Sequence, residues 1–188
     1  IDPRVSDSTR KATIHLQCRP GEDHAILAGM LNIIIQEQLF DADFVSTNIT
    51  GFEQLATEVS AFTPDYVADR AGIPAEQLLQ AARVFATAKL RHANSGTGPS
   101  FSMYCNLKEY LLACLNSICG AYTRAGELAT RPNAMLPAYT PKAQAMAPFK
   151  AWGFGEKMRV RGLTDTAAGM PTAALADEIL MPGEGQVR

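Results

Sequence analysis

The sequence has little excess of either charge, few aromatic residues and no long uninterrupted apolar run. Its 188 residues include 17 lysines and arginines against 19 aspartates and glutamates, a formal net charge of −2. That balance excludes a strongly basic nucleic-acid-binding protein and an acidic disordered tail. Aromatic residues make up 7% of the chain, too few for a platform that stacks single-stranded bases. The densest apolar run, Met30 to Ile35, contains Asn32 and is much shorter than the ~18 residues of a membrane span. We therefore expect neither a nucleic-acid partner nor membrane insertion.

Cysteine and histidine are also scarce, and neither is spaced for a metal centre. The four cysteines include no CxxC pair, and the spacing of Cys114 and Cys119 on one predicted helix suits neither a disulfide nor a metal. We interpret all four as buried, reduced thiols, which favours a reducing, cytoplasmic compartment. His15, His24 and His92 have no partner histidine at ligand spacing. Because hydrolase, zinc-protease and Walker motifs are absent as well, the sequence predicts no catalytic and no metal-ligating residue.

What is present is an alternation of strand and helix patterns. Ile14–Cys18 alternates apolar and polar residues as a short strand does, and Arg91–Ser95 is placed as a second strand. Pro64 and Pro74 are each placed to open a helix. Helical spacing of apolar residues recurs in six segments: 24–39, 41–47, 52–59, 75–88, 106–119 and 173–180. The pattern predicts an α/β layer fold with a small parallel sheet.

The composition changes after Gly126. Four prolines then follow at short intervals among alanines: Pro132, Pro137, Pro141 and Pro148. We therefore expect residues 1–126 to form the α/β domain. Residues 127–188 would form a Pro-rich covering or connecting segment that leads toward a further domain.

Three loops that follow predicted strands, or that resemble a strand end, suggest one binding site. They are Asp2-Pro3-Arg4, Arg19-Pro20-Gly21-Glu22-Asp23 and Gly96-Thr97-Gly98. Ligands of open parallel sheets bind at the carboxyl ends of the strands. A carboxylate can accept two hydrogen bonds from the edge of guanine, and an arginine can stack on a base or pair with a phosphate. Glycines let backbone amides approach a phosphate or a fused ring closely. These residues therefore suit a nucleotide.

Each loop also has a simpler structural interpretation. Asp23 can cap the helix that follows it, and Asp2-Pro3 can be a plain turn. Gly96-Thr97-Gly98 alone is a pattern that many turns contain. An NAD-dependent dehydrogenase is a further possibility, but no GxGxxG fingerprint follows the first predicted strand.

Taken in order, the segments resemble the molybdopterin guanine dinucleotide oxidoreductases, the family of dimethyl sulfoxide reductase, formate dehydrogenases, nitrate reductases and thiosulfate or polysulfide reductases. Ile1-Asp2-Pro3-Arg4 resembles the strand-end motif of that family, and Arg19-Pro20-Gly21-Glu22-Asp23 resembles its R-P-G-T-D loop. Leu115-Asn116-Ser117-Ile118-Cys119-Gly120 is similar to its L-N-x-x-x-G element. The resemblance spans residues 1–126 and resumes at residues 175–188, and its order and spacing are more specific than any single segment.

The resemblance implies a three-layer, Rossmann-like dinucleotide-binding domain, which holds the guanosine end of a molybdopterin guanine dinucleotide. Ile1 and Arg4 would line the nucleotide, Asp2 would shape the strand end, and Gly96 and Thr97 would approach the pterin and the metal. The implied cofactor-binding residues are Ile1, Asp2, Arg4, Gly21, Asp23, Gly96 and Thr97.

Two residues depart from the family pattern. Glu22 stands where the family has threonine and would weaken binding of a diphosphate if its carboxylate pointed inward. Phe101 stands in a loop where some relatives carry a polar residue that faces the metal pocket, so the substrate stays open.

In this family the iron–sulfur cysteines and the ligand of molybdenum or tungsten lie upstream, and a cofactor-covering barrel lies downstream. The sequence contains neither and opens with Ile1 rather than Met. We therefore expect an internal fragment of the large catalytic subunit, inactive in redox chemistry when isolated. Its partners would be the remaining domains of the polypeptide and an electron-transfer subunit, and a periplasmic location stays open for the family. The alternative is a stand-alone α/β module that binds a nucleotide or a partner.

Overall fold

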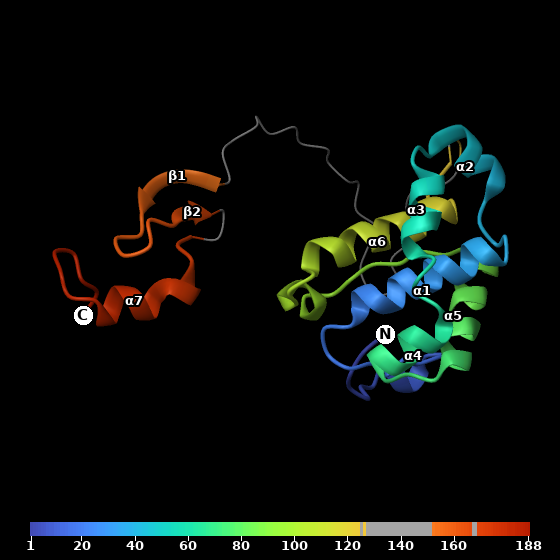
Figure 1. The fold of residues 1–188 in the computed structure, drawn as a ribbon, viewed down its shortest axis with the longest axis horizontal. Coiled ribbons are helices and arrows are strands. Elements are labelled where there is room, and N and C mark those ends of the chain that lie inside the picture. Colours follow the sequence, from blue (N-terminus) through green and yellow to red (C-terminus); the bar gives the residue numbers. More distant parts are fainter. Residues whose placement is uncertain (125, 127–151, 167–168) are drawn as a thin grey trace, which may run out of the picture. The chain divides into compact units, whose positions relative to one another are not determined.

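The structure, a computed structural model, describes residues 1–124, 126, 152–166 and 169–188. The chain divides into two compact units, Ile1–Arg131 and Pro132–Arg188, which are considered separately (Figure 1). The Pro-rich stretch expected to cover the domain falls largely on residues 127–151, outside the described residues. No helix of the described ranges is long and apolar enough to cross a membrane.

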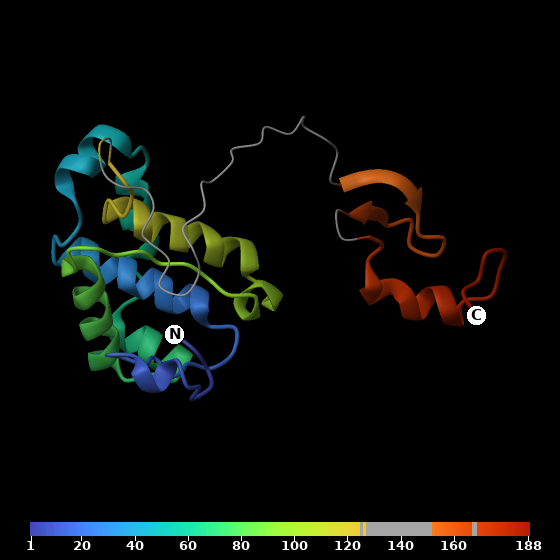
Figure 2. The same cartoon turned by 180° about the vertical axis from the view of Figure 1, so that it is seen from behind.

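The first unit is a set of helices around one buried helix, α1 (Asp23–Gln36). Every residue of α1 from His24 to Ile34 is buried, which agrees with its wide apolar face. Figures 1 and 2 show neighbouring helices on several sides of α1. These helices are α3 (Phe52–Val59), α4 (Pro64–Ala71), α5 (Ala75–Thr87) and α6 (Cys105–Ile118). The short α2 (Ala42–Asn48) packs against α6.

A glycine allows α1 to approach its neighbours closely. A Cβ atom on Gly29 would lie 2.9 Å from Val67 Cγ2 of α4 and 3.2 Å from Leu78 Cδ2 of α5. The first distance is shorter than real contacts allow, so any larger residue would push these helices apart.

The helices begin near the prolines and capping residues that mark helix starts in the sequence. Pro64 occupies the first turn of α4, where its missing N–H costs no hydrogen bond, and Thr63 caps that helix by accepting from Tyr66 N. Asp41 caps α2 in the same way, accepting from Phe44 N at 3.0 Å. Pro74 lies one residue outside α5, as its N-cap.

The expected parallel sheet is not present among the described residues. Neither Ile14–Cys18 nor Arg91–Ser95 is a strand, although Leu16 and Cys18 point inward as the alternation predicts. In place of a neighbouring strand, the Asn116 side chain accepts from Ala93 N at 2.9 Å and donates to Ala93 O at 2.7 Å. A parallel strand needs a partner backbone along its edge. Among the described residues, segment 14–18 receives one such bond, from Asp2 N to Leu16 O, and segment 91–95 receives none. The Rossmann-like arrangement therefore stays a prediction.

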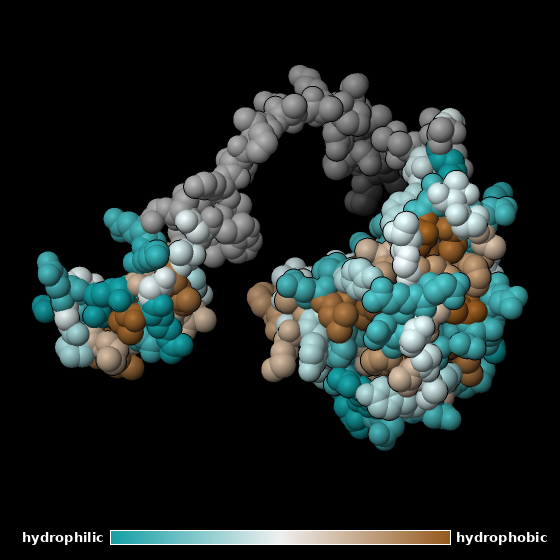
Figure 3. Space-filling model, turned by 45° about the horizontal axis from the view of Figure 1, so that its top comes forward, coloured by the Kyte–Doolittle hydropathy of each residue, from teal (hydrophilic) through white to brown (hydrophobic). Residues whose placement is uncertain are grey.

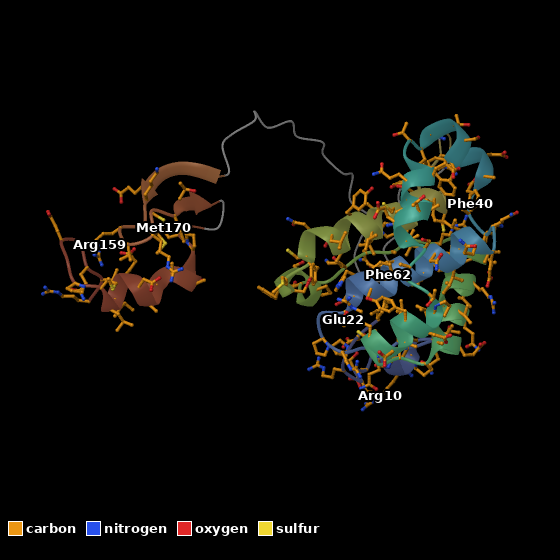
Figure 4. All side chains as sticks on the ribbon, viewed as in Figure 1. Arg10, Glu22, Phe40, Phe62, Arg159 and Met170 are labelled. Atoms are coloured by element: carbon orange, nitrogen blue, oxygen red, sulfur yellow. The ribbon has the colours of Figure 1, made fainter. Side chains whose placement is uncertain are left out.

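The described part of the second unit contains an antiparallel pair, β1 (Trp152–Lys157) and β2 (Thr164–Thr166), followed by η3 (Thr172–Ala174) and α7 (Leu175–Leu180). The buried Glu178 holds this unit together by accepting from Val160 N at 2.8 Å and pairing with Arg159, which Figure 4 labels. Figure 3 shows hydrophobic residues on the surface of both units, separated by hydrophilic ones.

Candidate functional site

The first unit contains a cavity of about 1260 Å³. Its floor is apolar and includes Leu16, Leu27, Met30 and Leu115. Six of the seven residues that the resemblance implied for cofactor binding line it: Ile1, Asp2, Arg4, Gly21, Asp23 and Gly96. The seventh, Thr97, lies between the lining residues Gly96 and Gly98 but is not itself part of the wall. The three loops, far apart in sequence, therefore meet at one hollow.

The N-terminal turn is fixed by Asp2. Its carboxylate accepts from Arg4 N at 2.8 Å, which closes the turn, and its carbonyl accepts from His15 Nε2 at 2.8 Å. Asp2 N donates to Leu16 O at 3.2 Å. These bonds hold the turn beside the segment 14–18 and place Arg4 at the cavity.

The loop before α1 is held by Arg19, a role that the sequence analysis missed. Arg19 N donates to Ala71 O at 2.8 Å, and its guanidinium donates to Asp69 O and Arg70 O at 2.7 and 2.9 Å. The side chain thus satisfies carbonyls at the end of α4. Gly21 has φ +89° and no atom within 4 Å of where a Cβ would lie, so its open side faces the cavity unobstructed.

Asp23 is the first residue of α1, and the interpretation of Asp23 as a cap is wrong. Glu22 occupies the N-cap position and makes no side-chain capping bond. The Asp23 carboxylate has no hydrogen-bond partner in the described part of the chain and lines the cavity, so its oxygens are available to a ligand's N–H groups.

Glu22 is directed to α4 rather than to the cavity. Its Oε2 lies 2.5 Å from Arg70 Nε, and the second side of that guanidinium donates to His24 Nε2 at 3.1 Å. Figure 4 places Glu22 at the start of α1. The negative charge is therefore paired with Arg70, and the expected penalty of an inward Glu22 does not arise in this arrangement.

The same contacts define the protonation of His24. Nδ1 must donate to Gly21 O at 3.1 Å, because a carbonyl only accepts, while Nε2 accepts from Arg70. Burial, followed by the charge of Arg70, lowers the pKa of His24. The ring also lies 4.5 Å from that of Tyr104. A neutral His24 thus ties the loop of Gly21 to α4 and to the start of α6.

The glycines of the third loop are not required by the fold. A Cβ on Gly96 or Gly98 would meet no atom within 4 Å, and neither residue has a positive φ. The amides of Gly96, Thr97 and Gly98 donate no hydrogen bond to any described residue. Phe101, which the sequence analysis singled out, is 85% exposed at the cavity. This loop, which lines the cavity at Gly96 and Gly98, therefore has open space beside its glycines and three amides without a described acceptor.

Sequence reasoning also missed a buried lysine in the cavity wall. Lys108 is 1% exposed on the buried face that it shares with Leu111, whereas the neighbouring Leu107 is 44% exposed. Lys108 Nζ donates to Ser95 Oγ at 2.9 Å and to the Glu109 carboxylate. Bonds from Lys108 and Ser95 lower the pKa of Glu109. The apolar spacing predicts the helix but not the burial of Lys108, which the folded structure shows.

A second missed residue, Arg91, joins the ends of two helices. Its guanidinium donates to Ala86 O and Ala88 O, at 2.7 and 2.8 Å, and to Cys119 O at 2.9 Å. It thereby satisfies carbonyls where α5 and α6 end, and these donors are committed to the protein rather than to a ligand.

The cysteines are unpaired, and only Cys18 and Cys119 are buried, so the expectation of four buried thiols holds for two of them. Burial raises the pKa of Cys119 to about 11, which keeps it a thiol at neutral pH. No group of three or more His, Cys, Asp or Glu side chains in the described ranges is placed to hold a metal ion.

Comparison with known proteins gives consistent relatives. The chain is 37% identical over 138 residues to the molybdopterin-containing subunit of thiosulfate reductase from Salmonella typhimurium, covering 72% of this chain and 18% of that subunit. It is 39% identical over 88 residues to formate dehydrogenase H of Escherichia coli, covering 47% of this chain and 12% of the relative. No protein-family model matches it.

A solved structure agrees with the sequence relatives. Acetylene hydratase from Pelobacter acetylenicus matches 70% of this chain and 18% of its own, with a TM-score of 0.64 and 31% identity. The chain thus spans about a fifth or less of the length of these relatives. The predicted resemblance is confirmed, and the chain belongs to the family of molybdopterin-containing oxidoreductases.

Proposed function

We propose that this chain binds the guanosine end of a molybdopterin guanine dinucleotide as part of a larger oxidoreductase. The observation that carries the proposal is the convergence of six implied contact residues on one cavity. The names of the relatives favour a formate-, nitrate- or sulfur-compound-type substrate for the whole enzyme. An electron-transfer subunit and the rest of the polypeptide would be its partners.

The side chains at the cavity fit a guanine nucleotide. The unpartnered Asp23 carboxylate can accept from N1–H and the N2 amino group of guanine, while Gly21 leaves room for the base edge. Arg4, exposed beside the turn closed by Asp2, can stack on the base or pair with a phosphate. Gly96 and Thr97 would lie toward the pterin.

When bound, the pterin and its molybdenum or tungsten would supply two-electron redox chemistry. The contribution of this chain is to orient the cofactor through its nucleotide and to shield it with the apolar floor around Leu27 and Met30. An iron–sulfur cluster, if the enzyme carries one, would be bound elsewhere.

Calorimetric titration of the chain with guanosine diphosphate (GDP), inosine diphosphate (IDP) and NAD tests this proposal. We expect GDP to bind more tightly than IDP, which lacks the N2 amino group, and NAD to bind weakly. Asp23→Asn should reduce GDP affinity by about tenfold and abolish the preference over IDP, since one acceptor is replaced by a donor. Equal affinity of the wild type for GDP and NAD would contradict the proposal.

Asp65→Asn is the matched control. Asp65 also lies in the first turn of a helix, α4, but it is exposed and does not line the cavity. Both substitutions remove a carboxylate from a helix start and so change the interaction with the helix dipole alike. Only a contact with the base makes D23N differ from D65N in GDP affinity.

A further inference from the structure

The cavity wall at Gly21 is held by a histidine that does not itself line the cavity. His24 is 5% exposed, and its Nδ1 donates to Gly21 O at 3.1 Å. No backbone amide of the described ranges donates to that carbonyl. Gly21 lines the cavity, so the carbonyl of Gly21 is the point at which a buried side chain fixes a cavity loop. The position of this loop therefore depends on one imidazole N–H.

The second nitrogen of the same ring faces a permanent positive charge. Arg70 Nη2 donates to His24 Nε2 at 3.1 Å. The guanidinium is held from two further directions, by Glu22 Oε2 at 2.5 Å and by Tyr66 Oη at 3.1 Å. Arginine has no acceptor to offer, so its bond to His24 requires that Nε2 carry no proton. Protonation of His24 would set two N–H groups and two like charges against each other at this distance.

The contacts decide which of the two side chains gives way. Arg70 keeps its ion pair with Glu22 and its bond to Tyr66 whatever the state of His24. Apart from Arg70, the polar and ring contacts of the imidazole with described residues are those to Gly21 O and to the ring of Tyr104. We therefore expect a protonated ring to move away from Arg70 and to release the carbonyl of Gly21.

The charged and titratable groups around His24 come from three elements. The start of α1 supplies Glu22 and Asp23, α4 supplies Arg70 with its partner Tyr66, and the start of α6 supplies Tyr104. Burial, followed by the charge of Arg70, lowers the pKa of His24, and the two carboxylates oppose this shift. The ring is therefore neutral at neutral pH and takes up a proton below about pH 6.5.

We propose that His24 is a positioning residue of the cavity: its neutral form holds the loop of Gly21 for the guanosine ligand, and its protonation releases that loop and weakens binding. The inference rests on the proposed function for the identity of the ligand, and adds control of its affinity by a proton. Because such linkage is reciprocal, bound guanosine must in turn make His24 harder to protonate.

Calorimetric titration of the full 188-residue chain with guanosine, at about pH 7.5 and about pH 5.5, tests this inference. Guanosine is the probe because, unlike a diphosphate, it has no group that titrates in this range. We expect its affinity to fall about fivefold at the lower pH, the effect of one lost hydrogen bond. The ring signals of His24 in NMR spectra should also give a lower pKa in the presence of guanosine than in its absence.

His24→Asn removes the titration and keeps the contact. The amide nitrogen of asparagine lies where Nδ1 lies in histidine, so it can still donate to Gly21 O. The guanosine affinity of H24N should therefore be equal at both pH values. His15→Gln is the matched control. His15 also donates to a carbonyl of a cavity turn, Asp2 O at 2.8 Å, but no described arginine or lysine is hydrogen-bonded to its ring. H15Q should keep the fall in affinity that the wild type shows.

Arg70→Gln separates control by charge from a structural role of the same side chain. It removes the positive charge that opposes protonation of His24, so the midpoint of the pH dependence should move to higher pH. A purely structural Arg70 predicts instead that R70Q loses affinity at both pH values with an unchanged midpoint. Far-UV circular dichroism checks folding, and if H24N does not fold, the midpoint of R70Q decides.

The outcomes separate this inference from the proposed function. A wild type that binds guanosine equally at both pH values, or an H24N variant that loses affinity as steeply as the wild type, overturns the role of His24 and leaves the guanosine site in place. Absence of guanosine binding at both pH values overturns the proposed function. The control of the loop is then decided in the free chain, where the amide signal of Gly21 should shift with the same midpoint as the His24 ring. A Gly21 signal that does not follow that ring overturns it.

Discussion

At the scale of single residues, the site depends on side chains that satisfy backbone groups at a distance. Arg19 reaches the end of α4, and Arg91 reaches the ends of α5 and α6. His24 connects the loop of Gly21 with Arg70. Each side chain also has a partner far away in sequence, namely Asp69 for Arg19, Arg70 for His24 and Cys119 for Arg91, and residue spacing alone carries no signal for these contacts. The loops at the cavity owe their positions to these long-range contacts.

His24 predicts how stability depends on pH. Its pKa in the folded protein is lowered from 6.5, so the unfolded chain binds the proton more readily. The stabilising contribution of neutral His24 is therefore present above about pH 6.5 and is lost as the pH falls below that value. We expect the free energy of unfolding from urea titrations to decrease between pH 7 and 5. The slope from this one group is at most about 1.4 kcal/mol per pH unit.

The variant His24→Asn isolates this effect. It removes the titrating ring, so the difference in unfolding free energy between wild type and variant should shrink as the pH falls. His92→Asn, which replaces an exposed histidine of the same unit, is the control for the loss of a histidine as such. A slope in H24N as steep as in the wild type would assign the pH dependence to other groups.

At the scale of elements, local patterns were sufficient to predict the helices, whereas the expected parallel sheet stays a prediction. The helix expected at 75–88 is α5, and Pro64 opens α4 as its position indicates, because both signals are local. The strand alternation in Ile14–Cys18 is also local, but pairing requires a second backbone, which the pattern cannot specify. The same holds for the candidate site. Its loop residues were identified from sequence motifs, whereas Lys108 and Arg91 could be recognised only from their contacts in the folded structure.

Asn116 shows what replaces a strand partner in this fold. It is 7% exposed, and it is both acceptor and donor to Ala93. Asn116→Asp exchanges the donor for an oxygen facing Ala93 O, which leaves a half-buried carbonyl without its donor. We expect a loss of about 2–3 kcal/mol in the free energy of unfolding, measured by urea denaturation at pH 7.

Asn106→Asp on the same helix serves as comparison. Asn106 is exposed in the first turn of α6, where a negative charge interacts favourably with the helix dipole, so its stability should change by less than about 0.5 kcal/mol. Equal losses in N116D and N106D would mean that the pairing with Ala93 does not hold the segment 91–95.

At the scale of the whole molecule, the core and the site belong to one unit. All residues of the hydrophobic cluster lie between Leu16 and Cys119, and the cavity is lined by residues between Ile1 and Leu115. The relatives are much longer, so in them a region of this kind is one part among several. Within this chain, however, the first unit contains every group that the proposed nucleotide site uses.

This organisation predicts that a chain ending at Arg131 folds and binds without the rest. Because the hydrophobic cluster is retained in full, its free energy of unfolding should match that of the corresponding transition in the full chain within about 0.5 kcal/mol. Urea denaturation followed by circular dichroism, together with GDP titration, measures both properties. A chain ending at Gly72 is the control: it loses α5 and α6, two helices that pack on α1, and should show no cooperative transition. If residues 1–131 instead unfold at much lower urea or lose GDP binding, the second unit must stabilise the cavity, and the site cannot be assigned to the first unit alone.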